Sequence, residues 1–337
     1  MDSLTQIVLG GAVAEFVAGK KMGNKAILWG AIAGTIPDLD VFFRAFYEPI
    51  DAALIHRGFS HSILFSLLAS PLLAYLFTKI YRGKHEFNVW LKLFFFSIIT
   101  HPMLDMFTNY GTQFLWPLDT RISFNTIFVI DPLYTFPFLG CLIAVLFYQR
   151  ESPKRRRINN IGIIYSSSYL LLGVIIKLFI YFNVKNQYES NGYQVERIMV
   201  TPMPFTSLYW YALLEDDANF YVNYKSVFAP IELSETDTIS KSIRLDDLNW
   251  KDPDMSEKLS LISNNYYSIV FKENLYLFYD LRFGMSGKLT AEQINEPVMC
   301  YKLEKENNQI ISAKSDRNRK VFSKVDFHYY WKKIWGN

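Results

Sequence analysis

Three long uncharged apolar stretches constrain this chain more than any other feature. Residues 62–78, 132–149 and 158–176 run for 17, 18 and 19 positions without a charged side chain. A helix that spans a bilayer needs about 20 mostly apolar residues, within a range of about 17–25. The stretches therefore predict membrane insertion, against the alternative of a hydrophobic helical bundle in water.

Three further apolar segments are shorter or less uniform. Residues 93–104 carry no charge but include His101, and residues 4–14 and 26–37 are brief. The two brief segments could be tilted helices, re-entrant segments or buried helices. The first 184 residues thus predict a membrane α-helical bundle of about five to six hydrophobic segments. The start, MDSLTQIVLGG, has Asp2 in place of a basic region, so we expect no cleaved signal peptide.

Charge separates two parts of the 337-residue chain. Residues 1–184 hold 16 Lys and Arg and 11 Asp and Glu, whereas the shorter remainder holds 19 and 21. We therefore predict a membrane domain over residues 1–184 and a soluble domain over residues 185–337. The net charge of +3 lacks the basic excess of nucleic-acid-binding proteins. Two cysteines exclude a disulfide framework and Cys-rich zinc folds.

The soluble part has the composition of strands. Aromatic and β-branched runs at 267–271, 275–283 and 298–303 lie between turn signals. Residues 208–214 could be a strand or a segment that contacts the membrane. The sequence predicts a mostly β domain here, with no catalytic constellation of its own.

Basic loops predict the orientation. Lys and Arg gather in residues 20–25, 79–92 and 149–160, and such loops stay in the cytoplasm. This topology sends residues after 182 outside, so the β domain is expected to be extracytoplasmic.

The same topology brings ionisable residues to one outer depth. Residues of this kind are costly in a membrane unless they are paired or ligated, so they mark candidate functional sites. Imidazoles and carboxylates together suit a divalent metal, and zinc above others. The residues concerned are Asp2, Asp38, Asp40, His56, His61, His101, Asp105 and Asp131.

His101 and Asp105 stand four residues apart, which places both on one face of a helix. One metal could take both, or Asp105 could orient His101 from behind. Pro102 could kink or start the helix. The alternative is a buried structural pair.

His56 and His61 are five apart and would diverge on a continuous helix. Gly58 lets the backbone turn between them, and Ser60 is a candidate N-cap for the helix that follows. Arg57 could bind a phosphate or carboxylate with its planar donor fork. The alternative is two solvated loop histidines.

Asp38 and Asp40 flank Leu39 in a Pro-Asp turn, where both could approach one cation. The alternative is a polar turn that ends a helix. Asp131 precedes Pro132 and could be a ligand or only an N-cap.

The ordered motifs resemble the YdjM-type family, whose members are described as inner-membrane, metal-dependent hydrolases. The resemblance covers roughly residues 1–150 and rests on the opening MDSLTQ with Gly10, then PDLD, HRGFSHS and HPMLD. It implies a multi-pass protein of the bacterial inner membrane. The family opening usually has Thr-His where this chain has Thr5-Gln6, and Gln is a poor zinc ligand. Asp2 could supply the missing ligand.

The family is also distantly similar to zinc-dependent phospholipase C and P1-type nucleases, which implies phosphoester chemistry. Under this hypothesis His56, His61, His101 and Asp105 bind the metal, with Asp38 or Asp40 completing the shell. A carboxylate among Asp38, Asp40 and Asp131 acts as general base, and Arg57 stabilises negative charge. The substrate would be an ester or phosphoester, including a membrane lipid or lipid-linked molecule. The alternatives are a metal or proton transporter and a non-catalytic membrane scaffold with a structural metal.

Overall fold

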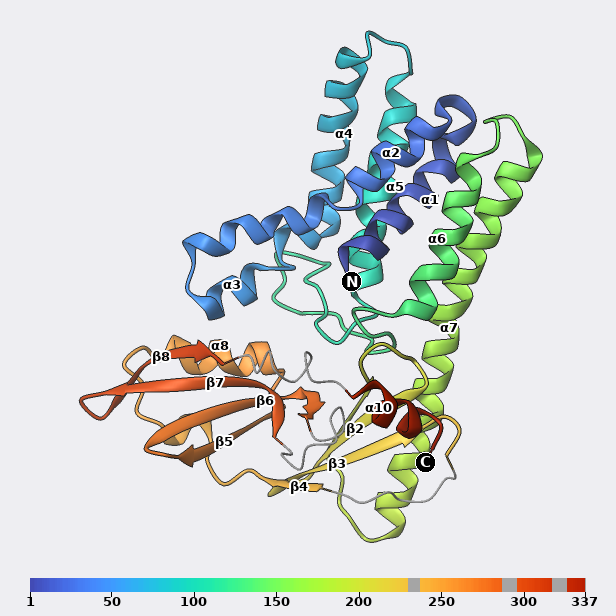
Figure 1. Ribbon diagram of the computed structural model, residues 1–337. Helices are drawn as coiled ribbons and strands as arrows, with labels where there is room; N and C mark the ends of the chain where they lie inside the picture. Colours follow the sequence, from blue (N-terminus) through green and yellow to red (C-terminus); the bar gives the residue numbers. More distant parts are fainter. Residues whose placement is uncertain (230–236, 287–295, 317–325, 337) are drawn as a thin grey trace. The chain divides into compact units, whose positions relative to one another are not determined.

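A computed structural model describes residues 1–229, 237–286, 296–316 and 326–336 (Figure 1). The chain divides into two compact units, each described here by itself. The first unit comprises residues 1–45, 55–175 and 204–206, and the second comprises residues 46–54, 176–203 and 207–337.

The first unit is a helical bundle. Its short connections place neighbouring helices in hairpins, and α1 packs against both α2 and α5 (Figure 1). The elements that contribute to it are α1 (Ser3–Met22), α2 (Asn24–Ala33), η1 (Ile36–Phe46), η2 (Phe59–His61), α4 (Ile63–Ile80), α5 (Phe87–Asp105), α6 (Pro132–Leu146) and the first part of α7 (Pro153–Ser190).

Small residues let α1 and α2 cross closely. A Cβ placed on Gly30 would collide with the carbonyl oxygen of Gly10 and with the side chain of Ala14. A Cβ on Gly34 would lie 2.7 Å from the carbonyl oxygen of Gln6. Only glycine fits at this crossing, and the close approach brings the backbone at Gly34 near the start of α1.

Among the residues that the structure describes, four stretches are long and apolar enough to cross a membrane. They are residues Asn24–Phe43, α4, α5 and α7, while α6 is shorter. The sequence predicted five to six hydrophobic segments, so the apolar helical character is confirmed and the predicted number stays a prediction. The first segment, expected over residues 4–14, extends to Met22 because the bundle accommodates Glu15 with a buried partner, Arg155.

The second unit contains two four-stranded antiparallel sheets, which confirms the predicted β content. The strands pair in the order of the chain within each sheet. The first sheet contains β1 (Arg197–Pro202), β2 (Tyr209–Glu215), β3 (Asn219–Ser226) and β4 (Asp237–Ser240). The second contains β5 (Tyr267–Lys272), β6 (Leu275–Met285), β7 (Pro297–Glu306) and β8 (Gln309–Ser315). Of residues 208–214, left open as strand or membrane segment, all but Leu208 lie in β2.

Aromatic side chains make the cores of this unit. One cluster joins Leu213 and Tyr211 of the first sheet to Leu281 of the second, together with Tyr330 of α10 (Phe327–Ile334). The end of α7 covers the first sheet through Val184 and Tyr188. The second sheet packs against α8 (Asp254–Ser263) and α3 (Pro49–Ile55), with the short helix η3 (Leu245–Asp247) beside them.

Candidate metal centre

Four side chains from three separate segments of the first unit converge in one pocket. Asp38 comes from η1, His61 from η2, and His101 and Asp105 from the last two turns of α5. One ligand atom of each lies within 4.8 Å of the others. We call these four residues the His–Asp cluster. Helix α5 continues through Pro102 to Asp105, so His101 and Asp105 share the face that their spacing predicted.

The donor atoms of the His–Asp cluster have nearly tetrahedral separations. Nε2 of His61 lies 3.2 Å from Nε2 of His101 and 3.3 Å from Oδ1 of Asp38. Nε2 of His101 lies 3.5 Å from Oδ1 of Asp38. Oδ2 of Asp105 lies 3.7 Å and 3.9 Å from the two imidazole nitrogens. A tetrahedral ion about 2.0–2.1 Å from its ligands sets them about 3.3–3.4 Å apart.

Hydrogen bonds behind the rings fix the tautomers. Nδ1 of His101 lies 2.5 Å from the carbonyl oxygen of Gly34, which can only accept, so this nitrogen carries the proton. Nδ1 of His61 lies 2.9 Å from the Ser60 hydroxyl, which itself donates to Asp40. When both rings are neutral, each Nε2 atom therefore presents its lone pair to the other at 3.2 Å. Such a contact is repulsive unless a cation lies between them, as in metal sites where the second ring nitrogen is held from behind.

Asp105 directs one oxygen into the cluster. Its Oδ1 accepts from Nε2 of Gln6 at 2.9 Å and pairs with the amino group of Met1. Its Oδ2 is buried and accepts no hydrogen bond from the described residues. Nε of Arg57 lies 3.3 Å from this oxygen but does not meet hydrogen-bond geometry. A buried, unsatisfied carboxylate oxygen that faces two imidazole lone pairs is the donor set a divalent metal completes.

Asp40 lies behind the cluster rather than in it. Its Oδ1 contacts Nδ1 of His56 at 2.7 Å, and its Oδ2 accepts from the Ser60 hydroxyl at 2.7 Å. Burial acts to lower the pKa of His61, but the hydrogen bonds to Asp38 and Asp40 outweigh it and raise the pKa of His61 above its ordinary value. Burial lowers the pKa of His56, because its bond to Asp40 only partly offsets desolvation. The carboxylates of Asp38 and Asp40 thus favour positive charge at His61, which a metal ion on Nε2 would supply in place of a proton, whereas His56 is kept neutral by its burial.

Exposure within the His–Asp cluster is uneven. The side chains of His61, His101 and Asp105 are fully buried, whereas that of Asp38 is 26% exposed. Access to the cluster is therefore from the side of Asp38.

The remaining predicted residues lie elsewhere or play a different part. Asp2 caps α1 and accepts from the backbone and hydroxyl of Thr5. Asp131 caps α6 and accepts from the Tyr169 hydroxyl at 2.9 Å. The guanidinium of Arg57 is buried, donates to Thr108 at 3.1 Å and lies over the ring of Tyr110. His56 contacts Asp40, and its ring centroid lies 5.6 Å from that of His61.

One local prediction around the histidines was wrong. Ser62, not Ser60, caps α4 and accepts from the backbone of Phe65 at 3.0 Å, because the Ser60 hydroxyl is turned to Asp40. The backbone does turn between the two histidines, and Arg57 adopts the left-handed conformation there, with φ of 66°. Gly58 is needed for space, since a Cβ there would lie 2.9 Å from the carbonyl oxygen of Ile55.

Sequence reasoning missed the part that Gln6 plays. It stands where the family pattern has His, and it donates to the Asp105 carboxylate and to the carbonyl oxygen of His101 at 3.3 Å. It thus holds the ligand-bearing turn of α5 from the side of α1. The sequence also gave no sign that the Gly34 carbonyl oxygen accepts from Nδ1 of His101, because every residue has a backbone carbonyl.

Comparisons with known proteins agree with the membrane character of the first unit. A family model described as YdjM inner membrane protein matches residues 1–180, more than half of the chain. The protein YfhP of Bacillus subtilis, described as uncharacterized, is 27% identical over 217 residues, which cover 60% of this chain and 62% of YfhP. The inner membrane protein YbcI of Escherichia coli is 29% identical over 113 residues, which cover 32% of this chain and 64% of YbcI. The matches thus span less than two thirds of each relative's length. No solved structure matches.

Proposed function

The chain belongs to the YdjM inner membrane protein family, and from this membership and the His–Asp cluster we propose that it is a membrane-bound, metal-dependent hydrolase. The proposed ligands are Asp38, His61, His101 and Asp105. Zinc is the metal we expect, because two imidazoles with two carboxylates at tetrahedral separations suit it. The proposed substrate is an ester or phosphoester, and a lipid or lipid-linked molecule suits a site among apolar helices.

A bound divalent ion supplies a water nucleophile at neutral pH and polarises the scissile carbonyl or phosphoryl group. The surrounding residues determine how the ligands are held. Gly34 and Ser60 keep the protons of the two imidazoles on Nδ1, away from the pocket. Asp40 accepts a hydrogen bond from the Ser60 hydroxyl and contacts Nδ1 of His56. It therefore orients the ring of His61, through Ser60, and the ring of His56 directly.

Asp38 is the residue we assign to proton transfer. Its carboxylate is the part of the His–Asp cluster that solvent reaches, so a substrate and its water would meet this group first. One oxygen contacts both imidazoles, which leaves the other free to accept a proton. Arg57 lies beside Asp105 and would add positive charge next to the reacting centre.

The observation that carries the proposal is the pair of imidazole lone pairs 3.2 Å apart, flanked by the unsatisfied oxygen of Asp105. A purely structural His–Asp pair would place a proton between donor and acceptor. Here both acceptor atoms face one point together with two carboxylate oxygens.

A structural metal is the second candidate function. Four protein ligands would close a tetrahedral site, and closed sites are typical of structural zinc. The partial exposure of Asp38 favours catalysis, since this ligand is the one that a substrate could displace. His56, Asp2 and Asp131 remain proposed members of the site only if the metal shell is larger than the His–Asp cluster.

Activity and metal content measured together test the proposal. The protein is purified in detergent, its metal is quantified, and hydrolysis is followed with bis(p-nitrophenyl) phosphate, p-nitrophenyl butyrate and mixed phospholipid micelles. We expect about one zinc per chain. We also expect hydrolysis that a chelator abolishes and added zinc restores. Stoichiometric metal with no metal-dependent hydrolysis of any of the three substrates would contradict the enzyme and favour the structural metal.

A comparison of Asp38→Asn with His101→Gln separates the two functions. In a hydrolase, Asp38→Asn keeps the metal on three buried ligands and loses turnover, whereas His101→Gln loses both. In a structural site both variants lose metal and thermal stability together.

A further inference from the structure

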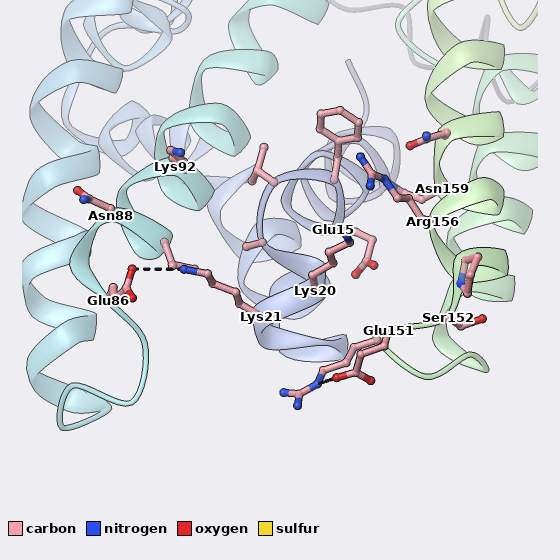
Figure 2. A pocket seen from close by; sticks show the side chains of 17 residues that line it. Glu15, Lys20, Lys21, Glu86, Asn88, Lys92, Glu151, Ser152, Arg156 and Asn159 are labelled. Atoms are coloured by element: carbon pink, nitrogen blue, oxygen red, sulfur yellow. Dashed lines mark hydrogen bonds and ion pairs between the residues drawn. The ribbon is translucent and has the colours of Figure 1, made fainter.

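Figure 2 shows a basic cleft of about 650 Å³ in the helical bundle. The cleft lies at the N-terminal end of α5, whereas the His–Asp cluster lies at its C-terminal end. Its walls are the C-terminal half of α1, the first turns of α5 and the first turns of α7. On α5, Val89 of the cleft and Asp105 of the cluster are 16 residues apart, which is about 24 Å along a helix. The cleft is therefore separate from the proposed metal centre, and the inference below does not depend on the hydrolase proposal.

Cations exceed acids in this cleft. Five basic side chains line it, namely Lys20, Lys21, Lys92, Arg150 and Arg156, against three acids. Each acid has its own cation: Glu15 pairs with Arg155, Glu86 with Lys21, and Glu151 with Arg150. Lys20, Lys92 and Arg156 form no ion pair with any residue in the described part of the chain. Three positive charges thus remain without a partner around one cavity.

The start of α7 adds to this positive potential. A helix N-terminus carries a partial positive charge, which Asp or Glu in the first turn usually offsets. Helix α7 begins at Pro153, has no acidic residue in its first turn, and continues with four basic residues, Lys154 to Arg157. The local sequence therefore raises the positive potential at the cleft, which a bound anion would lower.

Two asparagines with buried side-chain oxygens provide a second observation, Asn159 being buried and Asn160 half-buried as residues. Asn159 and Asn160 line the cleft, and the side-chain oxygen of each is buried without a hydrogen-bond partner among the described residues. The amide of Asn159 cannot simply be reversed, because its Nδ2 donates to the carbonyl oxygen of Ala12 at 3.0 Å. Unsatisfied buried acceptors are uncommon, and a hydroxyl donor would satisfy them.

Apolar side chains lie next to the charges. Phe16, Val17 and Val89 share the lining with the lysines, and Phe16 is 59% exposed. The cleft also borders α5 and α7, which are long and apolar enough to span a membrane. A ligand here would meet cations at its head and apolar surface beside them, which is the pattern of an anionic lipid at a basic pocket between membrane helices.

We propose that this cleft binds the phosphate-bearing, hydroxylated headgroup of an anionic phospholipid. Lys20, Lys92 and Arg156 neutralise the phosphate, and the headgroup hydroxyls donate to the asparagine oxygens. Phosphatidylglycerol is the probe that carries both features.

Thermal unfolding in detergent, with lipid added, tests this proposal. We expect phosphatidylglycerol to raise the Tm of the protein and phosphatidylcholine to leave it unchanged. The variant Lys92→Ala/Arg156→Ala should weaken the apparent affinity for phosphatidylglycerol at least tenfold. The matched control is Lys84→Ala/Arg82→Ala, which removes the same charge from exposed positions that do not line the cleft, and it should change the affinity less than twofold.

Three results would overturn the proposal. Equal stabilisation by phosphatidylcholine would show that the cleft does not select anionic lipids. Equal loss of affinity in the two double variants would show a general surface charge effect rather than a site. Stabilisation by soluble glycerol phosphate at the same concentration as the lipid would identify a soluble phosphate ester as the ligand and contradict the lipid.

Discussion

The two ends of the helical bundle differ in the charge of the side chains that they bring together. At the C-terminal end of α5, two acids and two imidazoles converge with their ligand atoms within 4.8 Å of one another. At its N-terminal end, three cations that form no ion pair with the described residues line a cleft. Helix α5 contributes residues to both sites, whereas α1 supports the first through Gln6 and lines the second with its C-terminal half. The comparison teaches that the ligands we propose for the two ends have opposite charge, a cation at the first and an anion at the second.

The largest expected effect is loss of metal at the histidine end. His101→Gln keeps a polar side chain of similar length but removes an imidazole ligand. We expect the bound metal to fall from about one per chain to below about a tenth. Zinc at about 100 times its Kd should stabilise the unaltered protein by about 2.7 kcal/mol and the variant not at all. Elemental analysis and thermal unfolding measure the two effects. If the variant retains its metal, His101 is not a ligand, and the contrast between a cation site and an anion site at the two ends fails.

The second-largest expected effect is a loss of unfolding free energy on breaking an ion pair beside the basic cleft. Glu15 and Arg155 form a doubly hydrogen-bonded pair with both N–O distances at 2.7 Å, and their side chains are 5% and 2% exposed. Glu15→Gln leaves a buried arginine uncompensated, which costs about 3–5 kcal/mol. Chemical denaturation in detergent should show this loss, while the metal content stays unchanged. A fall in metal content would mean that the two ends are not independent.

A smaller effect, on metal affinity, is expected from Asp40, which orients the rings of His56 and His61. Asp40→Asn keeps the shape of the side chain but weakens its hold on Ser60 and His56. Loss of such a supporting group lowers metal affinity about 10–100-fold. Metal titration with a competing chelator measures it. An affinity as low as that of His101→Gln would instead make Asp40 a direct ligand.

The smallest effect, expected to be none, concerns Asp2. Asn is as good an N-cap as Asp, so Asp2→Asn should keep both helix α1 and the metal affinity. The same chelator competition serves as the measurement. A loss of tenfold or more would restore Asp2 as a ligand and sharpen the boundary of the His–Asp cluster.

The sequence predicted much of this arrangement because hydrophobicity and spacing are local properties. The apolar stretches predicted helices, and the spacing of His101 and Asp105 predicted their common face. The runs at 267–271, 275–283 and 298–303 predicted β5, β6 and β7. The three basic loops, read only as an orientation signal, do share one end of the bundle, since residues from all three line the cleft.

The parts that escaped prediction depend on tertiary contacts. The first apolar segment was expected to end at residue 14, because the partner that buries Glu15, Arg155, lies 140 residues away. The cap of α4 was misassigned because Ser60 and Ser62 are equivalent by local rules, and only the carboxylate of Asp40 distinguishes them. The role of Gln6 depends on where α5 ends in space, which no local pattern gives.

Anomalous diffraction at the absorption edge of the bound metal tests the central claim most directly. We predict one strong peak between Nε2 of His61 and Nε2 of His101, with a carboxylate oxygen of Asp38 and of Asp105 about 2.0–2.2 Å from it. A metal-loaded protein with no peak among these four side chains, or with its peak held by other residues, would contradict the claim.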